Sequence, residues 1–189
     1  MPKIIIITGT PGAGKTTVLD GALKKFEGKV ARINYGDFMF EIAKQRGIKS
    51  RDDMRKQPLA VQRDIQTKAA EQISAQSKGL TIVDTHSAIL TPHGYIPGMP
   101  EWIIKALAPA AIVLVEAAPK QIAGRRAKDK TRKRDSESVA EIQLHQDLNR
   151  MFASSYAAMT GASVAIIVNA DKKLANAVEG LSSLIKSLL

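Results

Sequence analysis

The residues with the clearest chemistry are the octapeptide GTPGAGKT at positions 9–16. It follows a run of apolar, β-branched residues and precedes a stretch with helical periodicity, which is the context expected of the phosphate-binding pattern G-x-x-x-x-G-K-[ST]. Glycines let backbone N–H groups converge on phosphate oxygens, and the N-terminus of the next helix adds its positive dipole. A nucleoside triphosphate site is therefore predicted at Gly9, Thr10, Pro11, Gly12, Ala13, Gly14, Lys15, Thr16 and Thr17.

Two side chains of this loop have predicted roles, and one carboxylate elsewhere joins them. Lys15 is placed to reach the β- and γ-phosphates, and the Thr16 hydroxyl is placed to ligate Mg²⁺. Asp84 ends the apolar run LTIVD, where a carboxylate can help hold Mg²⁺ or its waters. The alternative for Asp84 is a helix cap or a strand-end turn, since Asp is common at such positions.

The most charged stretch of the chain is RRAKDKTRKRD at positions 125–135, where seven of eleven residues are Lys or Arg. The formal net charge is +10, and residues 119–134 hold eight basic residues against one acidic residue, so the excess is local. Local basicity indicates an anionic partner at one place. Such a run fits a nucleic-acid surface, a solvated surface, or a segment that closes over a phosphorylated small molecule.

The elements that must position these residues alternate along the chain. Short apolar runs predict buried strands at 3–8, 29–35, 80–84, 110–116 and 162–169. Helical patterns lie between them, with Asp37, Pro58, Ser138 and Asp171 as predicted first residues or caps. Residues 91–100, rich in Pro and Gly, predict an ordered loop. The order predicts a three-layer α/β fold of the P-loop NTPase type, with a five-stranded, mainly parallel sheet and helices on both faces.

Composition narrows the class further. A length of 189 residues fits one domain, and 44% hydrophobic with 24% charged residues is typical of a globular protein. No apolar run approaches the roughly 20 residues of a membrane span, and no signal-peptide layout is visible, so we expect a cytoplasmic protein. The chain has no cysteine, so a thiolate metal site is not expected.

The function class follows from what accompanies the phosphate loop. A GTP switch would carry D-x-x-G after the third strand and N-K-x-D after a later one, whereas this chain has DTHS and NADK. A small-molecule kinase predicts a short chain, a helical excursion after the second strand for the acceptor, and an arginine-bearing flap before the last strand. All three features are present.

Across essentially its whole length the chain resembles archaeal-type adenylate kinases. The matching stretches are GTPGAGKT, INYGDFMFEIA, RDDMRK, VDTHSAILTPHGYIPGMP, RRAKDKTRKRD and TGASVAIIVN. The resemblance implies Mg²⁺-dependent transfer of the γ-phosphate of ATP to AMP to give two ADP, and a homotrimer. It implies a single P-loop kinase domain (1–189), with a core (1–35, 80–124 and 139–189), a monophosphate-binding segment (about 36–79) and a short lid (about 125–138). The lid has no cysteines, so no zinc is expected.

The resemblance also suggests which residues act. Arg125 or Arg126 begins the lid and Arg134 returns from it, with Arg132 between them; guanidinium forks suit phosphate oxygens. For each of these arginines the alternative is a solvated helix face.

The acceptor side departs from the bacterial pattern, because DFMFEIA and DTHSA lack the arginines found there. We expect Arg51 or Arg55 and His86 to take those places, with Asp37 and Thr85 beside them. The alternatives are a surface salt bridge for Arg55, a structural histidine for His86 and a simple helix cap for Asp37.

Two other functions stay open at this point. A kinase of another small acceptor, such as CMP, UMP or shikimate, would share the loop and the lid. An RNA-associated NTPase would explain the basic charge, although aromatic residues make up 4% of the chain and residues 125–135 contain none to stack on bases.

Overall fold

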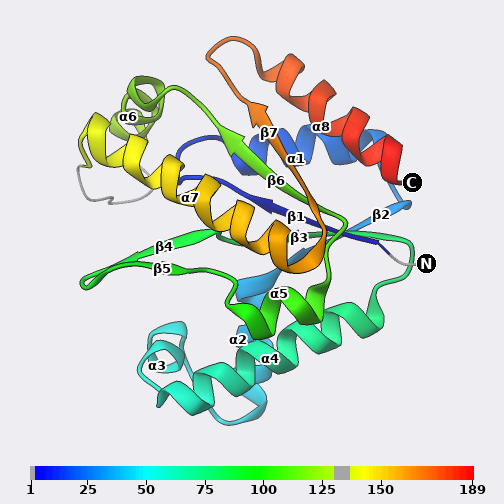
Figure 1. The fold of residues 1–189 in the computed structure, drawn as a ribbon, viewed down its shortest axis with the longest axis vertical. Helices are drawn as coiled ribbons and strands as arrows, with labels where there is room; N and C mark the ends of the chain where they lie inside the picture. The colour runs from blue at the N-terminus through cyan, green and yellow to red at the C-terminus, as the bar shows by residue number, and fades with distance from the viewer. Residues whose placement is uncertain (1–2, 130–136) are drawn as a thin grey trace.

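The computed structural model describes residues 3–129 and 137–189. Its centre is a five-stranded sheet in the order β2-β3-β1-β6-β7, in which every neighbouring pair runs parallel (Figure 1). The strands are β1 (Lys3–Thr8), β2 (Val30–Asn34), β3 (Leu80–Asp84), β6 (Ala111–Glu116) and β7 (Ser163–Val168). The predicted five-stranded parallel α/β fold is confirmed.

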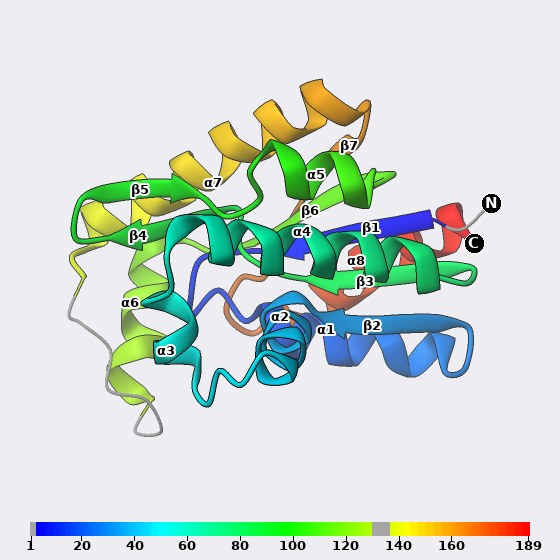
Figure 2. The same ribbon diagram turned by 90° about the horizontal axis from the view of Figure 1, so that it is seen from below.

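Helices cover both faces of this sheet (Figure 2). The helices are α1 (Lys15–Leu23), α2 (Tyr35–Gln45), α3 (Arg51–Arg55), α4 (Leu59–Gln76), α5 (Glu101–Leu107), α6 (Pro119–Lys128), α7 (Val139–Thr160) and α8 (Leu174–Leu188), with a short 3₁₀ turn η1 (Lys24–Phe26) after α1. Side chains of α2, α4, α5 and α7 form a core on one face of the sheet, and those of α1 and α8 form a core on the opposite face. The result is the predicted three-layer arrangement.

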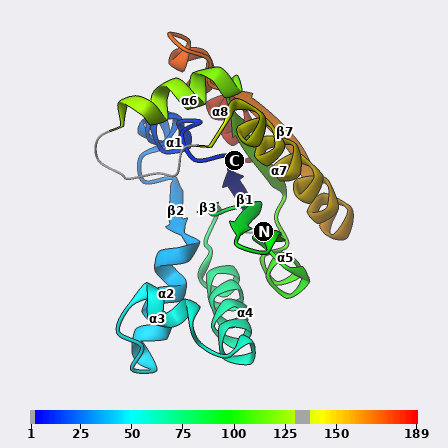
Figure 3. The same ribbon diagram turned by 90° about the vertical axis from the view of Figure 1, so that its left-hand side faces the viewer.

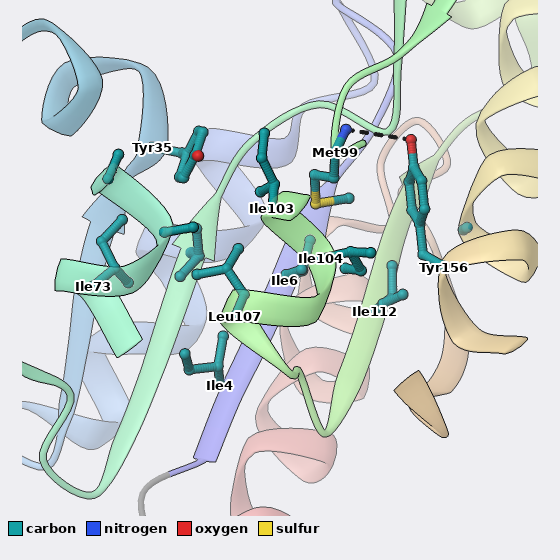
Figure 4. Close-up of a cluster of buried hydrophobic side chains, with 14 of the residues drawn as sticks. Ile4, Ile6, Tyr35, Ile73, Met99, Ile103, Ile104, Leu107, Ile112 and Tyr156 are labelled. Atoms are coloured by element: carbon teal, nitrogen blue, oxygen red, sulfur yellow. Dashed lines mark hydrogen bonds between the residues drawn. The ribbon is translucent and has the colours of Figure 1, made fainter. Parts of the chain in front are cut away.

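The run of four isoleucines in β1 is explained by this layering. Because successive side chains of a strand point to opposite faces, Ile4 and Ile6 enter the core beneath α4, α5 and α7. Ile5 and Ile7 enter the core beneath α1 and α8. Figure 4 shows the first of these cores, with Ile4 and Ile6 beside the side chains of α5. A strand with two buried faces has no polar alternation, and β1 is therefore continuously apolar.

Three predicted helix starts differ from the structure. Helix α2 is capped by Asn34, whose side chain accepts a hydrogen bond from the Asp37 backbone, so Asp37 lies inside the first turn. Helix α4 begins one residue after Pro58, and α8 begins at Leu174, so Asp171 is not its cap. The Asp171 carboxylate instead accepts hydrogen bonds from Arg125. Pairing with a distant cation is not visible in local sequence, and local capping rules therefore misplaced these two aspartates.

The segment predicted as a loop at 91–100 contains part of a β-hairpin. Strands β4 (Ala88–Thr91) and β5 (Gly94–Pro97) pair antiparallel and form a separate two-stranded sheet. Its return is tight at Gly98, where an added Cβ would lie 2.1 Å from the His86 carbonyl oxygen. Figures 1 and 2 show the hairpin projecting from the carboxyl end of β3 beside α7. The two strands pair through backbone hydrogen bonds despite the Pro and Gly residues between and within them.

The capping box predicted at the start of α7 is present. Ser138 accepts a hydrogen bond from the Glu141 backbone, and the Glu141 side chain accepts one from the Ser138 backbone. The helix ends at Gly161, which has the left-handed conformation typical of a helix C-terminus. Within the described ranges, no helix combines the length and the apolarity needed to cross a membrane.

Tyr156 of α7 ties this helix to the chain on either side of the hairpin. Its hydroxyl donates to the Ser87 carbonyl oxygen at 2.7 Å. It also accepts from the Met99 backbone N–H at 3.3 Å, and Figure 4 shows this second contact. Both contacts are buried, and burial raises the pKa of this phenol to about 12. The hydroxyl is therefore a fixed, neutral link.

Tyr156→Phe is expected to lower the free energy of unfolding by about 1–3 kcal/mol, because it leaves the buried Met99 N–H without a partner. It also removes one of two hydrogen bonds to the Ser87 carbonyl oxygen, which keeps the bond from the Gly98 backbone N–H. Urea unfolding of the variant and the parent protein would measure this. Thr160→Val, which removes a partly buried hydroxyl bonded within α7, is the matched control. A Tyr156→Phe loss no larger than that of the control would contradict the assignment.

Candidate active site

The predicted phosphate loop connects β1 to α1 and has the backbone that its glycines allow. Gly14 has a φ of +88°, and a Cβ at this position would lie 2.3 Å from the Asn169 side-chain nitrogen. Only glycine fits that position without moving its neighbour. The Asn169 side chain, which is buried, donates a hydrogen bond to the Ala13 carbonyl oxygen at 2.8 Å. The residue that follows β7 thus contacts the loop from one side.

Lys15 begins α1 and lies in a chain of alternating charges. Its ammonium forms an ion pair with Asp84 and donates a hydrogen bond to the Thr85 carbonyl oxygen at 3.0 Å. The other Asp84 oxygen accepts from Arg32 at 3.1 Å, and Arg32 also pairs with Asp20 at 2.6 Å. Asp84 is buried at the end of β3, so the two cations compensate its charge.

The residues predicted to hold magnesium fit a hard cation. Thr16 is exposed at the first turn of α1, and Asp84 pairs with the neighbouring Lys15. Hydroxyl and carboxylate oxygens are ligands that Mg²⁺ prefers. Because both Asp84 oxygens contact cations, an ion there requires Lys15 to turn toward phosphate. In the part of the chain that the structure describes, no three His, Cys, Asp or Glu side chains gather as a metal cluster. Two protein ligands plus substrate phosphates are nevertheless a usual magnesium arrangement.

Two of the four predicted lid arginines lie in the last turn of α6 and contact the phosphate loop. Arg125 donates to the carbonyl oxygens of Ala13 and Asn169, at 3.2 and 2.8 Å. Arg126 donates to the Pro11 carbonyl oxygen at 2.8 Å. Both guanidinium groups therefore lie against the loop. Arg132 and Arg134 fall outside the described residues.

Arg126 is the more enclosed of the two. Its side chain is 9% exposed and forms an ion pair of 2.7 Å with Glu137, which precedes the α7 cap. The remaining guanidinium nitrogen is buried and has no hydrogen-bond partner among the described residues. A buried, unpaired donor carries a free-energy cost, and an incoming phosphate oxygen would relieve that cost.

A cleft of about 880 Å³ opens beside Lys15. Its walls are α2, α3 and α4 on one side and the β4–β5 hairpin on the other; Figure 3 shows α2, α3 and α4 grouped at one end of the molecule, away from α6. Polar lining comes from Arg51, Arg55, Gln62, Gln66 and His86, and apolar lining includes Met39, Met54, Ile65, Ile89 and Ile96. A volume of this size suits a small-molecule ligand with both an apolar and an anionic part.

Some of the predicted acceptor residues line this cleft, and one does not. Arg55, Thr85 and His86 line the cleft, as does Arg51. Asp37 does not line it and instead forms an ion pair with Arg51. Arg55 pairs with Asp52 at 3.1 Å, but both side chains are about three-quarters exposed, so this contact leaves Arg55 free to bind an anion.

His86 follows the end of β3 by two residues, lines the cleft and is exposed. Partial desolvation, together with the positive charge of Lys15, lowers the pKa of its imidazole to about 4. The side chain is therefore neutral near pH 7. A neutral imidazole can donate one hydrogen bond to an anion without adding charge.

The NMR titration of His86 is expected to have its midpoint near pH 4 in the free protein. Adding AMP, the acceptor that the resemblance implies, should raise that midpoint if it binds here, because a phosphate beside the ring stabilises the imidazolium. The His86→Asn variant identifies the resonance. A midpoint near the ordinary value of about 6.5, unchanged by AMP, would contradict this placement.

Several residues at the site carry no sequence signal that we recognised. Arg32 lies in an edge strand that reads as an ordinary β-type run, and Glu137 lies two residues after the basic stretch. Gln62 and Gln66 lie one turn apart on α4, which does place both on one helix face. That spacing is the one signal that could have identified them.

The sequence matches a known family model and several named relatives. A family model described as an AAA domain matches residues 8–143. The adenylate kinase of Methanopyrus kandleri is 48% identical over 192 residues, covering 100% of both chains. That of Methanothermobacter thermautotrophicus is 46% identical and covers 97% of this chain and 100% of its own. That of Pyrococcus furiosus is 49% identical, covering 96% of this chain and 94% of its own.

The chain belongs to the adenylate kinase family. As a member of that family it is a P-loop phosphotransferase with adenylate kinase function, and the resemblance to archaeal adenylate kinases noted from the sequence is confirmed. The archaeal source of these relatives agrees with the resemblance to archaeal-type adenylate kinases.

Solved structures agree on the fold of this adenylate kinase family member. A shikimate kinase from Acinetobacter baumannii superposes with a TM-score of 0.57 at 19% identity, covering 99% of this chain and 94% of its own. One from Bacteroides thetaiotaomicron gives 0.56 at 16% identity, with 98% and 99% covered. At such identities the likeness concerns the fold alone.

Proposed function

We propose that this enzyme transfers the γ-phosphoryl group of ATP to AMP, and that the cleft beside Lys15 is the AMP site. The observation that carries the proposal is the position of that cleft, which opens on Lys15 and is lined by Arg51, Arg55 and His86. The names of relatives that are 46–49% identical support the same acceptor.

The chemistry requires no general base. The phosphate of AMP is already an anion near neutral pH, so one of its oxygens attacks the γ-phosphorus directly. The bond from that phosphorus to the β,γ-bridging oxygen breaks, and two molecules of ADP result. The difficulty lies in aligning two anions and neutralising charge on the transferred group.

The proposed residues align the two anions and neutralise charge on the transferred group. Lys15 turns from Asp84 to the β- and γ-phosphates, and Arg125 and Arg126 approach from the α6 side of the loop. Thr16 and Asp84 would hold Mg²⁺ or its waters, and the ion would supply positive charge that offsets the charge of the ATP phosphates.

Different parts of the chain have different roles in the proposed reaction. Residues 36–79 bind the acceptor and residues 125–138 form the lid, with the remaining residues as the core. The lid arginines Arg132 and Arg134 stay predictions, because residues 130–136 are outside the described ranges. The cytoplasmic location and the absence of zinc likewise stay predictions from sequence.

We also propose a homotrimer, on the resemblance to archaeal relatives. The edge strand β7 supports an interface, because Val164, Ile166 and Val168 are 39%, 47% and 58% exposed along it. Apolar side chains exposed in a row on a sheet edge are typical of a contact surface. The mass of the protein in solution tests this, and a monomeric mass at working concentrations would contradict it.

An acceptor panel tests the proposed reaction. With ATP and Mg²⁺ present, kcat/KM for AMP should exceed the values for CMP, UMP and shikimate. Shikimate is included because kinases of that acceptor share the fold. Equal or higher kcat/KM with any of the other three acceptors would contradict the AMP assignment.

A further inference from the structure

A buried asparagine in the middle of α7 joins two segments that lie far apart in the sequence. The Asn149 side-chain nitrogen donates to the Thr10 hydroxyl at 3.0 Å. Its side-chain oxygen accepts from the Ala88 backbone N–H at 3.0 Å. Asn149 is 3% exposed and Thr10 2% exposed, so both contacts are shielded from water.

The orientation of this amide is fixed by chemistry. The Ala88 backbone N–H can only donate, so the Asn149 oxygen must face it and the nitrogen must face Thr10. Turning the amide over would place two donors against each other in a buried position. The link therefore has one geometry.

Further buried hydrogen bonds connect the same segments around Asn149. The Ser87 backbone N–H donates to the Thr8 hydroxyl at 2.8 Å, and the Ser87 hydroxyl donates to the Asn149 backbone carbonyl oxygen at 3.0 Å. Ser87 and Thr8 are fully buried. A buried polar network in which these groups all find partners holds its members in one arrangement.

We propose that Asn149 is a positioning residue that sets the distance between the donor loop and the acceptor cleft. This inference rests on the proposed function. Thr10 belongs to the phosphate loop, and Ala88 begins the hairpin that lines the AMP cleft. One side chain thus fixes both halves of the reaction relative to each other.

The expected consequence is specific to transfer. Phosphoryl transfer needs the attacking oxygen and the γ-phosphorus in line, and a misplacement of about 1 Å can cost on the order of 10² in rate. Attack by water has no such geometric requirement on the hairpin. Loss of the link should therefore slow transfer to AMP more than hydrolysis of ATP.

Asn149→Leu, which keeps the branch at Cγ and removes both side-chain hydrogen bonds, is the direct test. We expect kcat for transfer to fall by about 10- to 100-fold, with KM for ATP and AMP changing less than about threefold. The fraction of ATP hydrolysed rather than transferred should rise. Both quantities are measured from AMP consumed and phosphate released, well below the melting temperature of the variant.

The control must lose stability without altering the hydrogen bonds of Asn149. Ile185 of α8 is buried in the core on the opposite face of the sheet, and Ile185→Val or Ile185→Ala can be chosen to match the loss of melting temperature. The control should keep kcat and the transfer-to-hydrolysis ratio. If Asn149→Leu behaves like this control, Asn149 has a structural role only and the proposal is wrong.

Thr10→Val gives a second test that does not require Asn149→Leu to fold. It keeps the shape of Thr10 and removes the hydroxyl that Asn149 binds. We expect a similar fall in kcat, and a double variant that loses little more than either single variant, since both act through one link. Fully additive losses would overturn the proposal. A parent protein that does not phosphorylate AMP would instead contradict the proposed function itself.

Discussion

Lys15→Ala is expected to lower kcat by a factor on the order of 10³ or more while leaving the protein folded. The reduction follows from losing the one loop cation placed at the mouth of the acceptor cleft, where charge develops on the transferred phosphoryl group. The fold should survive because Asp84, its ion-pair partner, keeps Arg32 at 3.1 Å. The buried carboxylate is thus not left without a cation.

Steady-state kinetics with ATP and AMP measure this loss, and circular dichroism confirms the fold. Lys24→Ala is the matched control, because Lys24 is an exposed lysine just after α1. It should keep kcat within about twofold. A Lys15→Ala variant with kcat within tenfold of the parent would remove Lys15 from the reaction.

Arg126→Ala is expected to lower kcat by a factor of about 10² to 10³, the scale seen when one charge-stabilising donor is lost. The guanidinium is held by the Pro11 carbonyl oxygen and by Glu137, and its third nitrogen is buried without a partner among the described residues. That nitrogen is the donor we expect to meet phosphate. Arg126→Lys should restore little, because an ammonium lacks the planar fork.

The kinetic pattern separates this role from simple substrate attraction. Loss of a transition-state contact lowers kcat and kcat/KM together, whereas loss of attraction raises KM alone. Lys120→Ala, an exposed cation of the same helix, is the control and should change neither. Unchanged kcat with a raised KM in Arg126→Ala would show that Arg126 binds ATP without stabilising the transition state.

The layers of this fold follow from patterns that local sequence carries well. Ile4 to Ile7 predict a strand with two buried faces, and Ser138 with Glu141 predicts the start of α7. The loop at 9–16 has a pattern strict enough to locate a phosphate site. These features depend on residues close in sequence, so the sequence alone determines them.

What the sequence did not predict depends on contacts between distant segments. Asp171 reads as a helix cap until Arg125 is placed beside it, 46 residues away in the chain. Asn149 reads as one polar position in a long helix, although its partners belong to the donor loop and the hairpin. The hairpin itself was hidden by Pro and Gly residues that usually interrupt strands. Tertiary pairing, which leaves no local periodicity, explains each of these differences.

The most direct test of the account is a crystal structure with a bisubstrate analogue in which a chain of phosphates joins two adenosines. We predict that one adenosine occupies the cleft between α2–α4 and the β4–β5 hairpin, beside Arg55 and His86. The phosphates should cross Lys15 and contact the Arg126 guanidinium nitrogen that has no partner among the described residues. An analogue that leaves this cleft empty, or whose phosphates do not contact Lys15, would contradict the proposed reaction site.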